Sequence, residues 1–178
     1  MFPVQRHGAR LCLREWRHDD AKAMHRWIGN AEVMRHLTWG TGSLSETETY
    51  LASLIARQRR HPRKEYFLAV ETSVDSVVIG DAGFTWVSPG TVEIGYFLEP
   101  DQWGKGLGLE AARLIIDLAT DLGAETIAAT CFKDNWRSER VMQACGMTRQ
   151  PHPDPDVLKY ALSTPGNTDS RKRLTPSP

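Results

Sequence analysis

The sequence predicts a mixed α and β (α+β) domain around one central sheet, mostly antiparallel, of about six or seven strands flanked by about four helices. Runs in which apolar residues alternate with polar ones are interleaved with segments whose apolar residues recur at helical spacing. The order is strand, two helices, three strands, helix, strand, helix and two strands, which is typical of helices packed on one sheet. The chain has 178 residues, 40% of them hydrophobic, which is enough for one well-buried core.

The first elements are a short strand and two helices. Residues 10–14 alternate as a strand does. Asp19 or Asp20 can cap the helix that follows, and Ser45 with Glu48 fits a capping box at the start of the second helix. The apolar residues that share a helix face are Ala21, Met24, Trp27 and Ile28 in the first helix and Tyr50, Leu51, Leu54 and Ile55 in the second.

Three strands, 66–71, 76–87 and 91–99, occupy the middle of the chain. The third runs into a glycine-rich turn and then into a helix that stops at Gly123. The apolar face of this helix is formed by Ala112, Ile115, Ile116, Ala119 and Leu122.

The last third of the chain predicts a strand, a helix and a pair of strands. Residues 126–132 are rich in β-formers, and Asp134 with Asn135 opens a helix that stops at Gly146. Two more strands are expected at 147–150 and 157–163. The composition then becomes polar, so we expect a single domain over 1–164 and a flexible tail over 165–178.

Charge and cysteine usage exclude several classes of protein. Lys and Arg total 22 and so do Asp and Glu, so no net field favours nucleic acid or a membrane surface as a partner. The three cysteines have no paired spacing, and we see neither a signal segment nor a long apolar run, so we expect a cytoplasmic protein. His25 and His36 have no third metal-ligand candidate nearby, so no metal is expected. A monomer and a homodimer both remain open.

The glycine-rich turn after the third middle strand predicts a phosphate site. A tight turn that opens a helix directs several backbone N–H groups at one point, on the positive end of the helix dipole. A dinucleotide fingerprint requires a third glycine where Leu109 stands, and a P-loop requires a hydroxyl where Gly106 follows the lysine. Acyl-coenzyme A fits better, because its diphosphate needs backbone donors and its pantetheine amides can pair with a strand edge. The turn consists of Trp103, Gly104, Lys105, Gly106, Leu107 and Gly108.

This segment resembles the acetyl-CoA signature of the GNAT N-acetyltransferase superfamily, Gln/Arg-x-x-Gly-x-Gly/Ala. Gly106 and Gly108 fill the glycine positions, and Trp103 stands where Gln or Arg is usual. The Trp-Gly-x-Gly form is similar to the branch of ribosomal-protein N-terminal acetyltransferases (RimJ/RimL-like). Three further features of that branch are Asp20-Ala21, Glu93-Ile94-Gly95-Tyr96 and Asn135-x-x-Ser138-x-x-Val141. The likeness covers roughly residues 9–162.

The resemblance implies a GNAT-like acyl-CoA N-acyltransferase fold. It also implies direct transfer of an acetyl group from acetyl-CoA, the cosubstrate, to a primary amine of a small molecule or a protein N-terminus. The expected contacts to the cofactor are the backbone of Phe97 and Leu98, the turn from Trp103 through Gly108, Asn135 and Ser138.

Glu93 and Ser138 are the candidate catalytic residues. Glu93 can take the proton of the amine directly or through water, with Asp81 or a water chain as alternatives, and Ser138 can donate to the sulfur. We expect His36, Trp39, Trp86 and Glu93 to line the pocket of the amine acceptor. A competing hypothesis is a non-catalytic acyl-CoA-binding or regulatory module of the same fold.

Overall fold

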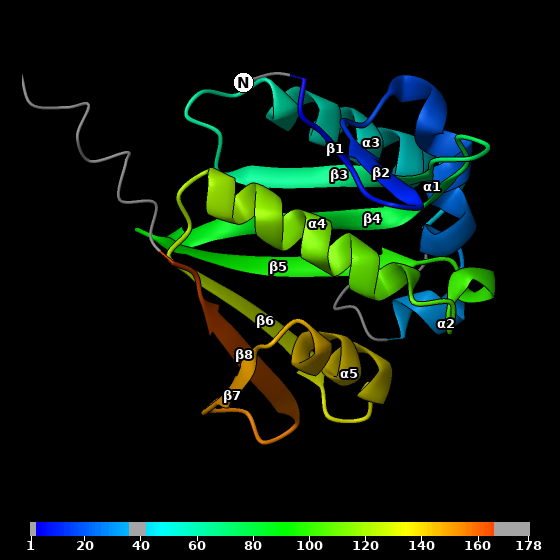
Figure 1. Ribbon diagram of the computed structural model, residues 1–178. Helices are drawn as coiled ribbons and strands as arrows, with labels where there is room; N and C mark the ends of the chain where they lie inside the picture. Colours follow the sequence, from blue (N-terminus) through cyan, green and yellow to red (C-terminus); the bar gives the residue numbers. More distant parts are fainter. Residues whose placement is uncertain (1–2, 36–41, 166–178) are drawn as a thin grey trace, which may run out of the picture.

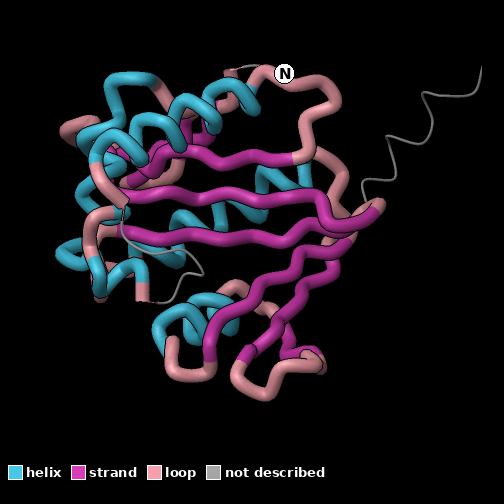
Figure 2. Tube along the Cα trace, turned by 180° about the vertical axis from the view of Figure 1, so that it is seen from behind, coloured by secondary structure: helices cyan, strands magenta, loops and turns pink. Residues whose placement is uncertain are grey.

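A computed structural model of the protein describes residues 3–35 and 42–165. Within these ranges one sheet of eight strands, in the order β1-β2-β3-β4-β5-β6-β8-β7, carries helices on both faces (Figure 1, Figure 2). The strands are β1 Gln5–His7, β2 Leu11–Arg14, β3 Glu65–Thr72, β4 Val78–Ser88, β5 Thr91–Leu98, β6 Thr126–Phe132, β7 Thr148–Gln150 and β8 Val157–Ser163. The α-helices are α1 Ala21–Ile28, α2 Ala31–Met34, α3 Leu44–Gln58, α4 Leu107–Asp121 and α5 Trp136–Ala144.

The predicted fold class is confirmed, with one strand and one helix more than expected in the described part of the chain. Neighbouring strands pair antiparallel except β5 and β6, which are parallel. Strand β1 has three residues, too few for alternation to be visible in the sequence. Helix α2 has four residues. Its N-cap is Asn30, whose side chain accepts a hydrogen bond from the Glu32 N–H at 2.9 Å. None of the helices in the described ranges is long and apolar enough to cross a membrane.

The starts of α1 and α3 differ from the predicted caps. The N-cap of α3 is Ser43, whose capping box uses Glu46, so the expectation for Ser45 and Glu48 was wrong. The Ser-x-x-Glu pattern occurs twice, two residues apart, and both copies fit the motif. Asp20 holds the N-cap position of α1, but its carboxylate makes no cap bond and pairs with an arginine instead.

The two faces of the sheet are covered by different helices. Helix α4 lies on one face, over β4 and β5, in the core that contains Phe84, Ile115 and Ile127. Helices α1 and α3 lie on the other face, in a second cluster that contains Trp16 and Trp27. Successive side chains of a strand point to opposite faces, so β5 presents alternate residues to each. Ile94, Tyr96 and Leu98 face α4, whereas Glu93, Gly95 and Phe97 lie on the α1/α3 face.

Strands β5 and β6 pair only at their beginnings. The parallel register joins Thr91, Val92 and Glu93 to residues 126–128. Beyond Glu93, β5 stays paired with β4 along its length, whereas β6 stays paired with β8, and the two strands diverge (Figure 1). The edge of β5 over residues 94–98 therefore faces the splay without a partner strand.

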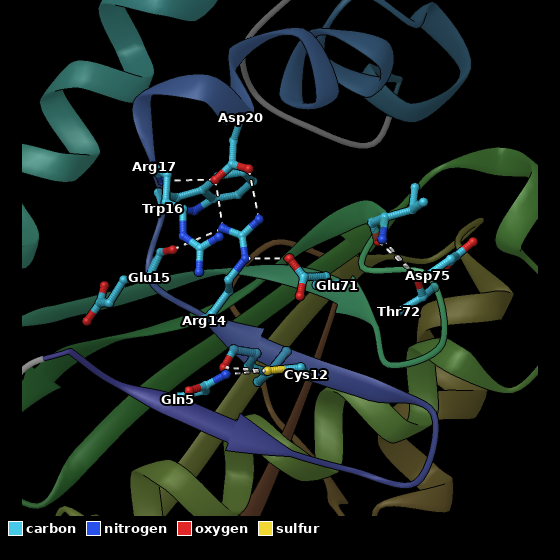
Figure 3. Close-up of polar contacts among 12 residues, drawn as sticks. Gln5, Cys12, Arg14, Glu15, Trp16, Arg17, Asp20, Glu71, Thr72 and Asp75 are labelled. Atoms are coloured by element: carbon cyan, nitrogen blue, oxygen red, sulfur yellow. Dashed lines mark hydrogen bonds and ion pairs between the residues drawn. The ribbon is translucent and has the colours of Figure 1, made fainter.

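A buried ion cluster connects the start of α1 to strands β2 and β3 (Figure 3). Arg14 on β2 holds both carboxylate oxygens of Asp20 at 2.8 Å and donates to Glu71 of β3 at 2.6 Å. The side chains of Arg14 and Asp20 are only 7% and 8% exposed. The Asp20 carboxylate also accepts the backbone N–H of Arg17 at 2.8 Å, so every charge in the cluster has a partner. This pair positions the start of α1 against the sheet.

We expect Asp20→Ala to lower the free energy of unfolding by about 3 kcal/mol, because the buried Arg14 guanidinium would lose its two-point partner. A matched control is Asp121→Ala, which breaks the exposed pair with Arg6 and should cost less than about 1 kcal/mol. Urea denaturation of both variants measures the difference. Equal losses in the two variants would contradict the role given to the buried pair.

Candidate functional site

The glycine turn at the end of β5 is built for close approach by a ligand. A 3-10 turn, η2 Pro100–Gln102, leads into the turn. Gly104 and Gly106 both adopt φ +75°, a left-handed conformation that favours glycine. Gly106 is the N-cap of α4 and provides no side-chain cap. The first N–H groups of α4 are therefore available to an anion, on the positive end of the helix dipole.

Three hydrogen bonds from neighbouring side chains hold this turn in place. Arg10, in the turn between β1 and β2, donates from Nη1 to the Lys105 carbonyl oxygen at 2.9 Å and from Nε to Glu110 at 2.9 Å. Burial opposes the charge of Glu110, but donors from Arg10 and the Leu11 N–H outweigh it and lower the pKa of this carboxyl. Trp103 donates its ring N–H to the Leu98 carbonyl oxygen at 2.8 Å, which joins the turn to the end of β5.

Helix α5 lies against the start of α4. A Cβ added at Gly108 would be in van der Waals contact with the Tyr96 ring at 3.8 Å and with Val141 of α5 at 4.0 Å. Asn135 is the N-cap of α5, and its Oδ1 accepts the Ser138 N–H at 3.2 Å. The structure thus places the segment of Asn135 and Ser138 on the helix that packs beside the glycine turn, and their roles stay predictions.

Tyr96 completes this side of the site, and we assigned it no role from the sequence. Its hydroxyl lies 3.3 Å from the Ser138 hydroxyl oxygen and 3.4 Å from the Ser138 carbonyl oxygen. Burial raises the pKa of Tyr96, and the hydrogen bond to Ser138 only partly offsets this. The phenol therefore keeps its proton at neutral pH and can donate a hydrogen bond. The alternation of side chains along β5 could have indicated a role for Tyr96, since it is the polar residue among the positions that face α4.

Glu93 lies on the opposite face, where β5 and β6 separate. Its carboxylate accepts a hydrogen bond from the Thr130 hydroxyl of β6 at 2.9 Å. Two residues further along β5, a Cβ at Gly95 would meet no atom of the described residues within 4 Å. This face of β5 therefore has room for an acceptor beside a carboxylate, and Thr130 is a neighbour that the sequence did not indicate.

Asp81 of β4 is buried on this same face, opposite Phe97 of β5 in the antiparallel register. It accepts the ring N–H of Trp16 at 3.2 Å and forms no ion pair within the described ranges. Burial raises its pKa to about 7, with the Trp16 hydrogen bond acting in the other direction. Burial, and after it the Asp81 charge, raises the pKa of the neighbouring Tyr50 to about 12.

Trp86, another predicted acceptor residue, lies on the face of the sheet opposite Glu93, so that expectation was wrong. Trp86 packs edge-on against Phe84, with 6.1 Å between ring centroids, on the α4 face of the sheet. His36 and Trp39 lie outside the described residues. Lys105 directs its ammonium group to the Gln102 side chain at 3.2 Å. In the described part of the chain, no group of three or more His, Cys, Asp or Glu residues is arranged to hold a metal ion.

A cavity of about 510 Å³ opens elsewhere, beside the Arg14–Asp20 pair. Arg17, Arg26 and Ser76 also line it, and neither the glycine turn nor Ser138 does. Arg26 is held by Glu99 and by the Val78 carbonyl oxygen. We therefore assign the site to the splay and not to this cavity.

Comparison with known proteins shows which proteins this chain is similar to. A family model described as an acetyltransferase (GNAT) domain matches residues 10–148. A curated relative, the uncharacterized N-acetyltransferase YnaD of Bacillus subtilis, is 25% identical over 142 residues, which are 79% of this chain and 81% of that protein.

Two solved structures have a similar fold at low sequence identity. One is RimL, a ribosomal L7/L12 α-N-protein acetyltransferase in complex with coenzyme A, with a TM-score of 0.75, 19% identity and coverage of 88% of this chain and 95% of that one. The other is the microcin C7 self-immunity acetyltransferase MccE in complex with acetyl-CoA and AMP, with a TM-score of 0.75, 17% identity and coverage of 88% of this chain and 94% of that one.

The raised pKa of Asp81 predicts a pH-dependent stability. An aspartate in an unfolded chain titrates near pH 4, but in the fold this carboxyl titrates near pH 7. The folded protein therefore binds the proton more tightly, and its free energy of unfolding should fall as pH rises from about 4 to about 7, by up to roughly 4 kcal/mol. Urea denaturation at pH 5 and pH 8 measures this.

The matched variant is Asp81→Asn, whose amide oxygen can still accept from Trp16. It should remove most of the loss between pH 5 and pH 8. If wild type and variant lose the same stability over this interval, Asp81 does not titrate as stated.

Proposed function

We propose that this chain, which belongs to the acetyltransferase (GNAT) family, moves the acetyl group of acetyl-CoA directly to a primary amine. The observation that carries the proposal is the splay between β5 and β6, which ends beside a glycine turn at the start of α4. One side of this splay holds hydroxyl donors and the other holds carboxylates.

Coenzyme A fits this arrangement along its length. The diphosphate lies on the N–H groups of the turn from Trp103 to Gly108, where Gly106 leaves the backbone accessible. The pantetheine amides pair with the open edge of β5 at Phe97 and Leu98, as an added strand would. Asn135, at the start of α5, contacts the same arm. The complexes of RimL with coenzyme A and of MccE with acetyl-CoA support this choice of cosubstrate.

The thioester then lies at the open edge of β5, between the two faces of the sheet. The amine must be neutral to attack, so Glu93 takes its proton, directly or through water, from the face on which Gly95 leaves room. The carbonyl oxygen develops negative charge, which the backbone N–H of Leu98 at the open edge of β5 stabilises, whereas the register with β4 directs the N–H of Phe97 to Asp81. The sulfur leaves toward Ser138 and Tyr96, whose neutral hydroxyls donate to the thiolate before it gains a proton.

The acceptor is a small-molecule amine or a protein N-terminus. RimL, named as a ribosomal L7/L12 α-N-protein acetyltransferase, supports a protein N-terminus as one acceptor class. The open surface beside Gly95 is compatible with either.

The experiment is release of free thiol from acetyl-CoA over a panel of amines that includes N-terminal peptides. Turnover with at least one amine supports the proposal. Binding of coenzyme A without turnover on any amine would favour the non-catalytic module, and no binding of coenzyme A would refute both.

We expect Gly106→Ala to weaken coenzyme A binding at least tenfold, because a Cβ placed 3.6 Å from the Arg10 guanidinium, on a left-handed backbone, would shift the N–H groups proposed to bind the diphosphate. The matched control is Gly123→Ala at the other end of α4, which also has a positive φ and open space around it. Each substitution should cost about 1 kcal/mol of stability from the left-handed backbone. Calorimetric titration with coenzyme A separates them, and equal affinities in the two variants would move the diphosphate away from this turn.

We expect Glu93→Gln and Ser138→Ala to slow turnover while they spare coenzyme A binding. The Glu93 change should lower kcat/KM about a hundredfold, the usual contribution of a general base, and the Ser138 change about tenfold, since Tyr96 remains as a donor. Unchanged kcat/KM in Glu93→Gln, with a collapse in Asp81→Asn, would assign the base to Asp81.

A further inference from the structure

The glycine turn begins with a residue that cannot contact a phosphate through its side chain. Trp103 stands where the family signature has Gln or Arg, and its ring N–H is already donated to the Leu98 carbonyl oxygen. A diphosphate bound there would receive no polar contact from the side chain of this first residue, and the cations at the turn itself are Arg10 and Lys105. The structure offers a replacement from a different element.

We propose that Arg137 of α5 supplies the positive charge that Trp103 does not, and binds the diphosphate of coenzyme A from across the splay. Its guanidinium carbon lies 5.1 Å from the centroid of the Trp103 ring, so the charge stands directly over the first residue of the turn. This inference rests on the proposed binding of coenzyme A in the splay.

The other nearby cations are already engaged. Arg10 is held by Glu110 and the Lys105 carbonyl oxygen, and the Lys105 ammonium group donates to Gln102. Arg137, by contrast, forms no ion pair with any carboxylate of the described ranges. An uncompensated guanidinium at the mouth of an anion site is the group that gains most from a phosphate.

Two rings hold Arg137 in place before a ligand arrives. Besides Trp103, it lies over the ring of Trp136, with 4.8 Å from the guanidinium carbon to the centroid. Stacking of this kind orients the planar guanidinium and lowers the conformational entropy that binding would otherwise cost. A guanidinium also matches two phosphate oxygens at once, which an ammonium group does not.

The position on α5 agrees with the path of the cofactor. Arg137 directly precedes Ser138, which meets Tyr96 where the sulfur is proposed to lie. Val141, one turn later, lies near Gly108 in the first turn of α4. Arg137 and Val141, one helical turn apart, therefore lie near Trp103 and Gly108 at the two ends of the glycine turn, and Ser138 between them in the sequence meets Tyr96.

The test is calorimetric titration of wild type and Arg137→Ala with coenzyme A, 3′-dephospho-coenzyme A and pantetheine. We expect the variant to bind both nucleotide ligands at least about tenfold more weakly, because one charge-assisted contact is lost. Pantetheine, which has no diphosphate, should bind wild type and variant equally.

The matched control is Arg140→Ala, which removes a guanidinium from the same helix that lies over Trp136, 4.9 Å from its centroid. It should change each dissociation constant by less than about twofold. An equal loss in this control would show that the positive charge of α5 as a whole favours binding, and it would overturn the direct contact proposed for Arg137. A loss with coenzyme A that is absent with the dephospho ligand would place Arg137 on the 3′-phosphate.

Unchanged affinities in Arg137→Ala would overturn the inference while the proposed function stands. Failure of wild type to bind coenzyme A would instead refute the proposed function and the inference with it.

Discussion

The parallel pairing of β5 with β6 ends after three residue pairs, and the rest of the site depends on that early end. Each strand stays with its other neighbour, β5 with β4 and β6 with β8, so the divergence is held open by complete antiparallel ladders on both sides. Backbone groups of β5 that would otherwise pair with β6 are left to a ligand. The same strand leads straight into the turn at the start of α4, so strand edge and anion site are aligned by chain connectivity alone.

One strand also separates the two reactants, because its side chains alternate between faces. Tyr96 reaches Ser138 on the α4 face, whereas Glu93 reaches Thr130 on the opposite face. A thioester held at the edge between them is exposed to donors from one side and to an amine with its base from the other. In the proposed reaction, the amine therefore attacks from one face of the sheet and the thiolate departs toward the other.

The sequence predicts the order of elements well, because alternation and helical spacing are local signals. It fails where a signal is too short, as in β1, or ambiguous, as in the choice between Ser43 and Ser45. The glycine turn and the Asn135–Ser138 segment can be found in the sequence because each consists of a few consecutive residues. The contacts of Tyr96 with Ser138 and of Glu93 with Thr130 join residues 42 and 37 positions apart, and only the register of the sheet and the packing of α5 bring them together.

Asp81 shows why such contacts matter for the chemistry. A buried carboxylate with one hydrogen-bond donor, and no cation among the described residues, is unfavourable in its charged form, so it destabilises the fold above neutral pH. Glu93, half-exposed at the splay, lies instead beside the Thr130 hydroxyl. The two carboxylates of this face therefore have different surroundings, and burial raises the pKa of Asp81 to about 7. The α1/α3 face thus holds Glu93, the proposed base at the splay, and Asp81, a buried carboxyl whose charge changes near neutral pH.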